Sequence, residues 1–341
     1  MQSAKIHTRS FDLIDNQQDW DQLVQSSPDN HPLQLWGWGE QKANFGWKPY
    51  RIASRLENLA MQVLLKPIPK TGYFLGHVPR GPIRIVDRLS TNQTSRPGLQ
   101  DTIDFLESIK VISLRLEPNN LESDPNPPSL LQYAKTYSGH VLTNHTLIVD
   151  LNKSIEELRS NMSNSCRYNV NKSAKQASVV SLLDYPEYYP DIYSIYQETA
   201  RRAGFNLYTF DYYKSQLNNL CDNLDILISI DNKTSKPIAF LWNIYSKNIT
   251  FELYAGVNSQ GRKLRANYNL KYQAILRAKQ RGQKVYDFNG RLNEQVDSFK
   301  RSFGPTVVDR MTTQKIVLSR LDQPFEILES LYRKIKRYSN I

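Results

Sequence analysis

A phenylalanine followed by a lysine, Phe299 and Lys300, is the pair best suited to chemistry in this sequence. The pair follows a short apolar segment, 284–288, and the turn Asn289-Gly290, so we expect the lysine just beyond the end of a strand. An ammonium at that place could stabilise a negative charge that develops on a reacting oxygen. The residue type alone leaves a second interpretation open, a solvated lysine on a surface turn, because lysines are mostly exposed.

Two further cations have positions that the local sequence restricts. Arg80 lies in the loop Gly76-His77-Val78-Pro79-Arg80-Gly81-Pro82, which we expect to be rigid, and a guanidinium fixed in this way suits a phosphate or a carboxylate. Bonding to the carbonyl groups of its own loop is the alternative. Lys42 is expected near the end of a helix over 32–45, where the helix dipole favours a cation, so a capping role is open beside ligand binding.

The stretch 267–305 positions Lys300. It predicts a helix capped by Asn267 and ended by Gly282, then a strand over 284–288, then a short helix that stops at Gly304-Pro305. Lys300 is expected to lie off the apolar face of the last helix, a face that is formed by Val296, Phe299 and Phe303.

Length and charge restrict the class of protein. The 341 residues suffice for two domains, and 44 Lys and Arg against 33 Asp and Glu give a net charge of +11 with a pI near 9.4. Such a balance favours a polyanionic partner, although a basic surface that only aids solubility is the alternative. The sequence shows no secretory signal, no membrane span and no metal-ligand spacing, and its two cysteines form no disulfide framework. We therefore expect a cytoplasmic protein without a metal.

The remaining elements suggest two α/β domains of one design, each with a mixed sheet. Each half reads as helices, a β-meander, a helix and a further strand, and the meander of the second half is expected at 225–230, 237–245 and 249–255. We place the first domain at 1–147 and the second at 148–317, with a C-terminal helix, 318–341, that packs on the first domain.

The hairpin, crossover helix and following strand resemble the core of the acyl-CoA N-acyltransferases, the GNAT fold. In that family a glycine-rich loop after the central strand cradles the CoA pyrophosphate. Here the loop is 256–266, its glycines lack that spacing, and Lys263 and Leu264 stand where the backbone would have to approach the ligand. The fold is therefore expected without CoA as the donor.

A set of motifs in a fixed order resembles the FemABX family of peptidoglycan interpeptide-bridge enzymes. The set is Gln34-Leu35-Trp36 with Lys42, Val78-Pro79-Arg80-Gly81-Pro82, Leu114-Arg115-Leu116-Glu117-Pro118, Phe251-Glu252-Leu253-Tyr254-Ala255-Gly256, Tyr286-Asp287-Phe288-Asn289-Gly290 and Phe299-Lys300-Arg301-Ser302-Phe303-Gly304. The resemblance implies two tandem GNAT-like domains. It also implies transfer of an amino acid from aminoacyl-tRNA, with no other cofactor, to the side-chain amine of the stem peptide. The acceptor would be UDP-MurNAc-pentapeptide or lipid II. The sequence has no long heptad segment for the helical-hairpin arm of some members, which favours the compact type.

The resemblance also assigns roles to residues. Lys300 matches the lysine that stabilises the oxyanion, and Phe299 the aromatic residue before it. Glu117 takes the place of an acidic residue near the acceptor amine and is one candidate for the base, the phosphate of the donor being the other. Substrate-binding roles fall to Lys42 and Arg80 at the diphosphate or sugar, to Tyr254 on the strand that faces the cleft, and to Arg202 at a phosphate.

Three alternatives remain on the sequence alone: a CoA-dependent N-acyltransferase, a related enzyme acting on another amine, and a non-catalytic RNA-binding protein. We expect a monomer, and a peripheral association with the inner face of the membrane stays open.

Overall fold

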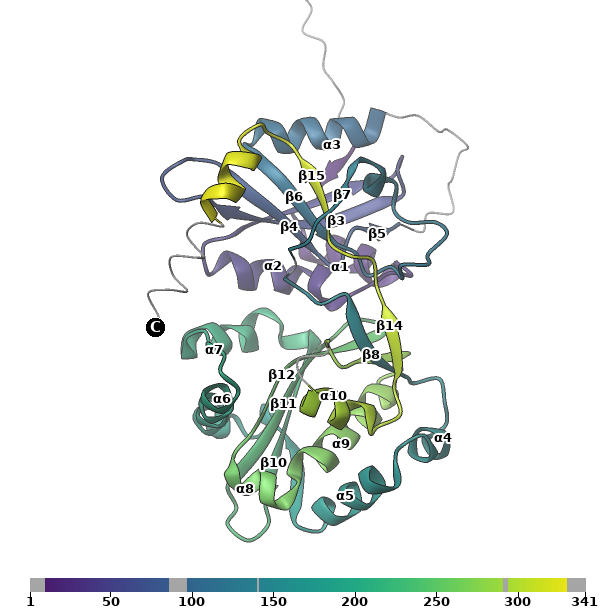
Figure 1. Cartoon of the computed structure of the whole chain (residues 1–341), viewed down its shortest axis with the longest axis vertical. Coiled ribbons are helices and arrows are strands. Elements are labelled where there is room, and N and C mark those ends of the chain that lie inside the picture. The colour runs from purple at the N-terminus through teal and green to yellow at the C-terminus, as the bar shows by residue number, and fades with distance from the viewer. Residues whose placement is uncertain (1–9, 86–96, 140, 291–293, 330–341) are drawn as a thin grey trace, which may run out of the picture. The chain divides into compact units, whose positions relative to one another are not determined.

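The computed structural model describes residues 10–85, 97–139, 141–290 and 294–329. The chain divides into two compact units, and both carry a mixed sheet (Figure 1). Unit 1 contains the chain up to Asp29, then Leu33–Leu142 and the part from Arg310 onward. Unit 2 contains Asn30–Pro32 and Thr143–Asp309.

Unit 1 has an eight-stranded sheet among its described residues, in the order β1-β2-β3-β4-β6-β15-β7, with β5 paired to β3. Strands β4 and β6 run parallel, and the other pairs are antiparallel. The strands are β1 (Asp12–Leu13), β2 (Lys48–Ser54), β3 (Leu59–Pro67), β4 (Phe74–Pro79), β5 (Ile83–Arg84), β6 (Val111–Glu117), β7 (Lys135–Thr136) and β15 (Gln314–Val317). The helices are α1 (Gln17–Ser26), η1 (Pro32–Gln34, shared between the two units), α2 (Trp36–Ala43), α3 (Pro97–Ser108) and η2 (Ser129–Tyr133).

Unit 2 has a seven-stranded sheet in its described part, in the order β14-β8-β13-β12-β11-β10-β9, and its parallel pair is β12 with β13. The strands are β8 (His145–Asp150), β9 (Ala177–Ser181), β10 (Leu224–Asp231), β11 (Pro237–Tyr245), β12 (Ile249–Val257), β13 (Val285–Asp287) and β14 (Thr306–Asp309). The helices are α4 (Ile155–Ser160), α5 (Asn164–Ala174), η3 (Leu182–Asp184), η4 (Pro186–Tyr188), α6 (Tyr189–Ala203), α7 (Phe210–Asn219), η5 (Cys221–Asn223), α8 (Ser259–Leu264), α9 (Ala266–Gln280) and α10 (Glu294–Arg301).

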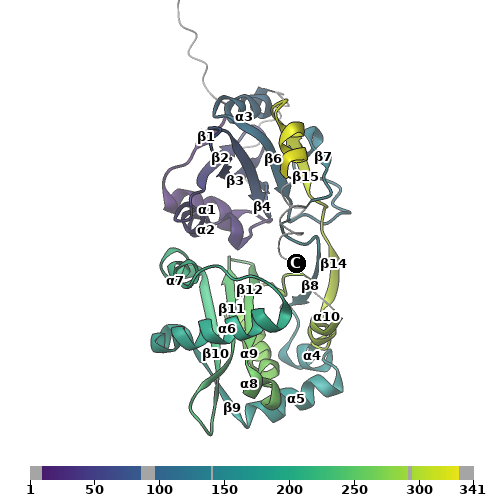
Figure 2. The same ribbon diagram turned by 60° about the vertical axis from the view of Figure 1, so that its left-hand side comes forward.

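The two faces of the unit 2 sheet are covered by different helices. Helices α5, α9 and α10 lie on one face, and α6 and α7 lie on the other (Figure 2). Helix α9 presents Leu270, Ala274, Ile275 and Ala278 to the sheet, and these side chains share one apolar core with β8, β11 and β13. Burial of this face, at roughly 25 cal/mol per Å² of apolar surface, is what fixes α9 as the crossover between β12 and β13.

Both units follow the order predicted from the sequence, a meander, a helix and a further strand, and the structure shows that this strand runs parallel to the last strand of the meander. In unit 1 these elements are β2-β3-β4, α3 and β6, and in unit 2 they are β10-β11-β12, α9 and β13. The fold class of two tandem GNAT-like domains is therefore confirmed. Among the described residues α6 and α9, of 15 residues each, are the longest helices, so this part of the chain holds no helical-hairpin arm.

The predicted cap of the crossover helix differs from the structure. Helix α9 begins at Ala266, after Arg265 in a left-handed conformation, so Asn267 lies inside its first turn and is not the cap. Residues 129–133 form the short η2 helix, which ends before β7 because residues 135–136 pair with β15. A capping box begins α4, with Ser154 as the N-cap and Glu157 as its second member.

The units divide at 142/143 and 309/310, whereas the sequence suggested boundaries at 147/148 and 317/318. The difference at the second boundary comes from β15, which pairs with β6 in the sheet of unit 1. The described start of the C-terminal helix, 322–329, contacts unit 1 through an ion pair of Arg115 with Glu329 at 3.4 Å and through Lys315 with Glu326 at 2.7 Å. Residues 330–341 of the predicted helix lie outside the described residues.

No helix within the described ranges is long and apolar enough to cross a membrane.

Candidate active site

Lys300 is buried in unit 2, with 4% of its surface exposed, so the interpretation of a solvated surface lysine is wrong. Its Nζ donates hydrogen bonds to the main-chain carbonyls of Phe288 at 2.7 Å and Gly290 at 2.8 Å. An ammonium has a third N–H to donate, and no residue in the described part of the chain accepts it. Within the described ranges, the Lys300 ammonium is thus held by two carbonyls and has one N–H that no acceptor takes.

The site lies where the two parallel strands of unit 2 separate. Strand β13 pairs with β12 only from Ile249 to Phe251, after which β12 continues to Val257 without β13 beside it. Glu252 is the first residue of β12 beyond the paired segment, and Phe288 and Gly290 follow the end of β13. Lys300 therefore binds the main chain just after β13 ends, and the position of its ammonium depends on the path of residues 288–290.

Three buried charged residues accompany Lys300 in this place. Lys271 of α9, which is 3% exposed, forms an ion pair with Glu252, and the hydroxyl of Tyr286 lies 3.3 Å from the same carboxylate. Tyr286 also donates to the side-chain oxygen of Asn243 at 3.0 Å.

Asp287 is fully buried and accepts bonds from the Thr146 hydroxyl and the Asn289 amide. Two ammonium groups and two carboxylates thus share a largely apolar core.

Burial dominates the electrostatics of both lysines. Desolvation lowers the pKa of Lys300, and the carboxylates of Glu252, Asp287 and Asp297 oppose this effect only in part. Desolvation likewise lowers the pKa of Lys271 to about 8, with Glu252 acting to raise it and Lys300 to lower it further. The site therefore holds ammonium groups that are easier to deprotonate than an ordinary lysine.

Phe299 packs against the neighbouring aromatic rings. Its ring meets Tyr268 edge-on at 5.0 Å and Phe303 at 5.3 Å between centroids. These contacts anchor α10 against α9, and Phe299 therefore sets the helix that carries Lys300. Its ring has no group that could transfer a proton or form a bond.

Tyr254 lies on the opposite face of the sheet from Glu252. A β-bulge causes this: Glu252 pairs with Asn243 and Tyr254 pairs with Trp242, so Leu253 is the extra residue. Without the bulge, residues 252 and 254 would share a face. The structure thus separates Tyr254 from the charged cluster around Lys300.

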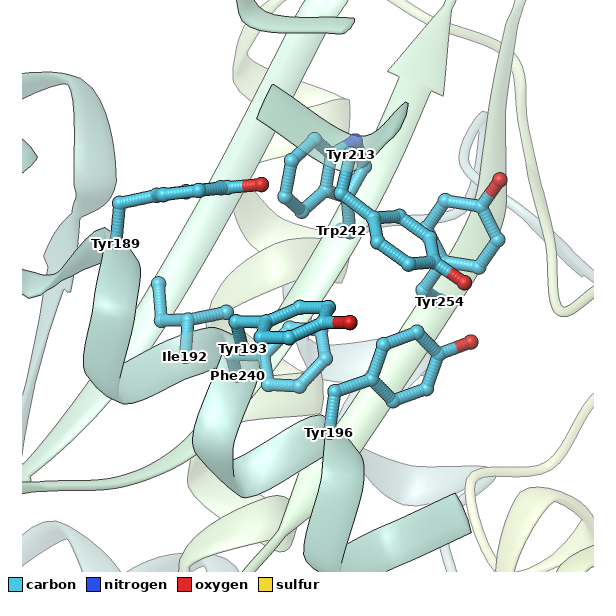
Figure 3. Close-up of a pocket in the computed structure, with 8 residues that line it drawn as sticks. All are labelled: Tyr189, Ile192, Tyr193, Tyr196, Tyr213, Phe240, Trp242 and Tyr254. Atoms are coloured by element: carbon cyan, nitrogen blue, oxygen red, sulfur yellow. The ribbon is translucent and has the colours of Figure 1, made fainter. Parts of the chain in front are cut away.

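On that opposite face Tyr254 belongs to an aromatic pocket between α6, α7, β11 and β12 (Figure 3). Its hydroxyl accepts a bond from Gln216 at 3.2 Å, and burial raises its pKa well above the ordinary value. The space between the rings is about 10 Å³, which is room for about one water molecule. The pocket as it stands is therefore closed to a sugar or a base. Its lining residues are Tyr189, Ile192, Tyr193, Tyr196, Tyr213, Phe240, Trp242 and Tyr254.

Arg202 is exposed in the last turn of α6, and one of its guanidinium nitrogens donates to the carbonyl of Val257 at 3.2 Å. Glu198 lies 3.9 Å from Arg202 and 3.8 Å from Arg262. This carboxylate partly neutralises both guanidinium groups at the end of β12.

Unit 1 brings Arg80 and Glu117 to the ends of its own parallel strands. Glu117 is the last residue of β6 and pairs with Pro79, the last residue of β4, and Arg80 follows directly. Arg80 is 1% exposed and has a φ of +52°, an uncommon value for a residue with a side chain. Gln34 fixes the loop by donating to the carbonyl of Pro79 at 2.6 Å. The rigid placement predicted for Arg80 is therefore seen, deep inside the unit.

The carboxylate of Glu117 is fully engaged. One oxygen accepts the amides of Val141 at 2.5 Å and Leu142 at 3.0 Å, and the other lies 2.8 Å from Nε2 of His77. Burial acts to raise the pKa of Glu117, but these bonds outweigh it and the pKa is lowered. A carboxylate held in this way is a weak base, and its geometry suits fixing the segment 141–142.

Lys42 lies in the last turn of α2, as predicted, and its Nζ is 4.7 Å from the centre of the Trp38 ring. Burial lowers its pKa to about 8. The seven candidate residues divide between the units: three belong to unit 1, namely Lys42, Arg80 and Glu117, and four belong to unit 2, namely Lys300, Phe299, Tyr254 and Arg202.

Sequence reasoning missed Lys271, Glu252 and Asp287 as members of the site. A signal was present, because each is a charged residue inside an apolar run: Lys271 beside Leu270 on a buried helix, Glu252 next to Phe251, and Asp287 between Tyr286 and Phe288. Charged side chains are rarely buried unless they are paired, so a charge inside such a run predicts a partner in the fold.

The repeated meander, crossover helix and parallel strand define a tandem GNAT-like protein, with a buried lysine at the strand exit of its second unit. The comparisons with known proteins identify the family. The sequence model of the FemAB family matches residues 131–232 and 221–323, which together span more than half of the chain, and the chain belongs to this family.

Relatives and solved structures agree with this assignment. The lipid II:glycine glycyltransferase of Staphylococcus aureus (strain MRSA252) is 24% identical over 234 residues, covering 63% of this chain and 54% of that protein. The chain thus spans about half the length of the curated relatives it matches. A crystal structure of FemX superposes with a TM-score of 0.79 at 17% identity, over 93% of this chain and 99% of that one. A tandem GNAT protein from the clavulanic acid biosynthesis pathway gives a TM-score of 0.52 at 11% identity, over 91% of this chain and 99% of that one.

Proposed function

We propose that this protein is an aminoacyltransferase that builds the interpeptide bridge of peptidoglycan. The donor is an aminoacyl-tRNA, and the acceptor is the side-chain amine of the stem peptide on UDP-MurNAc-pentapeptide or lipid II. Membership of the FemAB family and the similarity to a lipid II:glycine glycyltransferase support the reaction class. The observation that carries the proposal is the buried ammonium of Lys300, fixed by two carbonyls with a third N–H to donate.

The reaction asks for positioning and charge stabilisation. The neutral acceptor amine attacks the ester carbonyl, the C–N bond forms, and the carbonyl oxygen becomes an oxyanion. Lys300 donates its third N–H to this oxygen, an interaction that is typically worth about 3 kcal/mol. The C–O bond to the tRNA ribose then breaks, and the ribose oxygen takes up the proton that the amine releases.

The hydrogen bonds of Glu117 bear on which group accepts that proton. Both of its oxygens accept bonds from His77, Val141 or Leu142, and its pKa is lowered, so the carboxylate has little tendency to take a proton. We therefore favour transfer through a phosphate of the donor or through water over transfer to Glu117.

Cations bind the substrates in this proposal. Lys42 and Arg80 of unit 1 hold the diphosphate or the sugar of the acceptor, and the excess of basic residues holds the tRNA backbone in a salt-dependent manner. Such substrates place the reaction in the cytoplasm, with a monomeric enzyme as the simplest form.

The test is a transfer assay. The purified chain is incubated with a panel of charged tRNAs and either UDP-MurNAc-pentapeptide or lipid II in detergent micelles, and the product mass is read by spectrometry. A mass increase of one aminoacyl group that depends on both substrates is the expected result. Absence of product with every charged tRNA, from a chain whose circular dichroism and cooperative unfolding show it to be folded, contradicts the proposal. Uncharged tRNA and acetyl-CoA as donors are the controls.

A further inference from the structure

The buried pair of Lys271 and Glu252 has no evident structural purpose. It lies in the apolar core of unit 2, where a buried ion pair is often no more stable than well-packed apolar side chains. Both residues are at least nine-tenths buried, and Tyr286 supplies a further hydrogen bond to the carboxylate. Because burying two charges costs desolvation free energy, we looked for a function of the pair that involves the nearby Lys300.

We propose that Glu252 and Lys271 are positioning residues that set the charge of Lys300: Glu252 holds it as a charged donor by attraction, and Lys271, the ion-pair partner of Glu252, opposes that effect as a like charge. The inference rests on the proposed function, because it assigns the two residues a part in the same transfer reaction. Neither residue touches the substrate in this account. Both act on the reaction through the charge of Lys300.

The geometry carries the inference. Glu252 is the first residue of β12 beyond its pairing with β13, and the carbonyls that hold Lys300 follow the end of β13. The carboxylate is thus placed at the point where the strands part, and it is bonded to Lys271 on one side and to Tyr286 on another. The carboxylate therefore acts on two ammonium groups, on Lys271 through an ion pair and on Lys300 through attraction at longer range.

Among the described residues, four charged groups act on Lys300 or on its neighbour Lys271. Glu252 comes from β12, Asp287 from β13, Asp297 from α10 itself and Lys271 from α9. Asp297 is paired with Arg301 at 2.7 Å and Asp287 is bonded to Thr146 and Asn289. Glu252 heads the carboxylates that act to raise the pKa of Lys300, so it has the largest share in keeping the ammonium charged.

The sign of each effect follows. Lys300 must be protonated to donate, so turnover falls as pH rises through its pKa. Glu252→Gln removes a negative charge, which lowers that pKa and moves the alkaline limb of the kcat profile to lower pH. Lys271→Gln removes a like charge and moves the same limb up. The double variant removes both charges and returns the limb toward that of the wild type.

The test measures kcat at saturating acceptor across pH, since the titration of Lys42 affects binding and not the saturated rate. Asp225→Asn is the matched control for Glu252→Gln, because Asp225 is a buried carboxylate of the same sheet that is paired with Arg281 at 2.9 Å. Lys315→Gln is the matched control for Lys271→Gln, because Lys315 is a buried ammonium of unit 1 paired with Asp322 at 2.5 Å. Both controls are expected to lower stability without moving the limb.

Shifts of Glu252→Gln and Lys271→Gln in the same direction, or no shift in either, overturn the proposal. Should a variant fail to fold, Tyr286→Phe removes the hydroxyl that bonds Glu252 and Asn243, keeps every charge and gives a milder change. A separate readout is an NMR titration of ¹³Cε-labelled lysine, with the Lys300 signal assigned from Lys300→Arg. Opposite shifts of the Lys300 titration in an enzyme without transfer activity would reject the proposed function and keep the electrostatic role. Transfer activity with no shift would do the reverse.

Discussion

The two units of this protein share one fold and place opposite charges at the same point of it. In each unit a pair of parallel strands ends beside a buried ionised group. In unit 1 the group is the carboxylate of Glu117, which is held by donors from His77, Val141 and Leu142. In unit 2 it is the ammonium of Lys300, which is held by the carbonyls of Phe288 and Gly290. The same topology thus fixes an anion in one unit and a cation in the other.

Glu117 and Lys300 differ in the hydrogen-bonding capacity that the protein leaves unused. Glu117 has both oxygens engaged, and the bonds it accepts lower its pKa, so it is suited to hold its own chain in place. Lys300 donates to two carbonyls, and no acceptor in the described ranges takes its third N–H, so it is suited to act on a ligand. A repeated fold therefore supplies the position, and the balance of donors and acceptors around the group decides its role.

The largest effect on turnover is expected for substitution of Lys300, the buried group of unit 2 to which the proposed chemistry is assigned. Lys300→Met removes the ammonium and keeps the length of the side chain, so turnover should fall by about 10²–10³-fold with little change in the KM for the acceptor. Steady-state kinetics over both substrates measures this. Turnover within a few-fold of wild type would remove Lys300 from the mechanism, and the unfolding midpoint in urea controls for damage to the core.

A smaller effect is expected for Lys42 in unit 1. Lys42→Met should raise the KM for UDP-MurNAc-pentapeptide by about 10-fold and leave kcat nearly unchanged, because an ionic contact to a phosphate is lost. Burial lowers the pKa of Lys42 to about 8, so acceptor affinity should weaken as pH rises through this value in the wild type and stay flat in the variant. Isothermal titration calorimetry between pH 7 and about 9 tests this. A parallel decline of affinity in both proteins would show that Lys42 does not bind the acceptor.

Glu117→Gln sharpens the contrast between a group that fixes the chain and one that reacts. Its folded pKa lies below the ordinary value of 4.5, so its stabilisation is present above that value and is lost as pH falls through the folded pKa. The variant should lose about 2 kcal/mol of unfolding free energy at neutral pH, and the gap from the wild type should narrow on acidification. Urea unfolding at several pH values measures it. Turnover should change only a few-fold, whereas a loss of 10²-fold or more would restore Glu117 as the base.

The smallest effect is expected for Tyr254→Phe. The hydroxyl accepts one bond from Gln216 on the face of the sheet opposite Glu252, so its loss should lower stability by about 1 kcal/mol and leave kcat unchanged. Thermal unfolding and the transfer assay check both values. A fall in kcat comparable to that of Lys300→Met would mean that the aromatic pocket opens during the reaction and takes part in it.

The sequence predicted the repeated architecture well because that architecture follows from local patterns. The meander at 225–255, the capping box at Ser154 and the crossover helix over Leu270 to Ala278 are set by alternation, by side-chain capping and by helical spacing. The pairing of β15 with unit 1 was not predictable in this way, because a strand of four residues carries no information about which of two sheets it will join.

The sequence by itself determined that a lysine follows a strand end beside aromatic residues, and that the chain is basic and repeats one design. Only the tertiary structure decided that Lys300 is buried and that Glu252 and Tyr254 face opposite sides of the sheet. It also decided that Lys271 forms an ion pair with Glu252. The physical reason is that burial, a bulge and an ion pair across elements all depend on contacts between residues far apart in the chain. No local spacing encodes them.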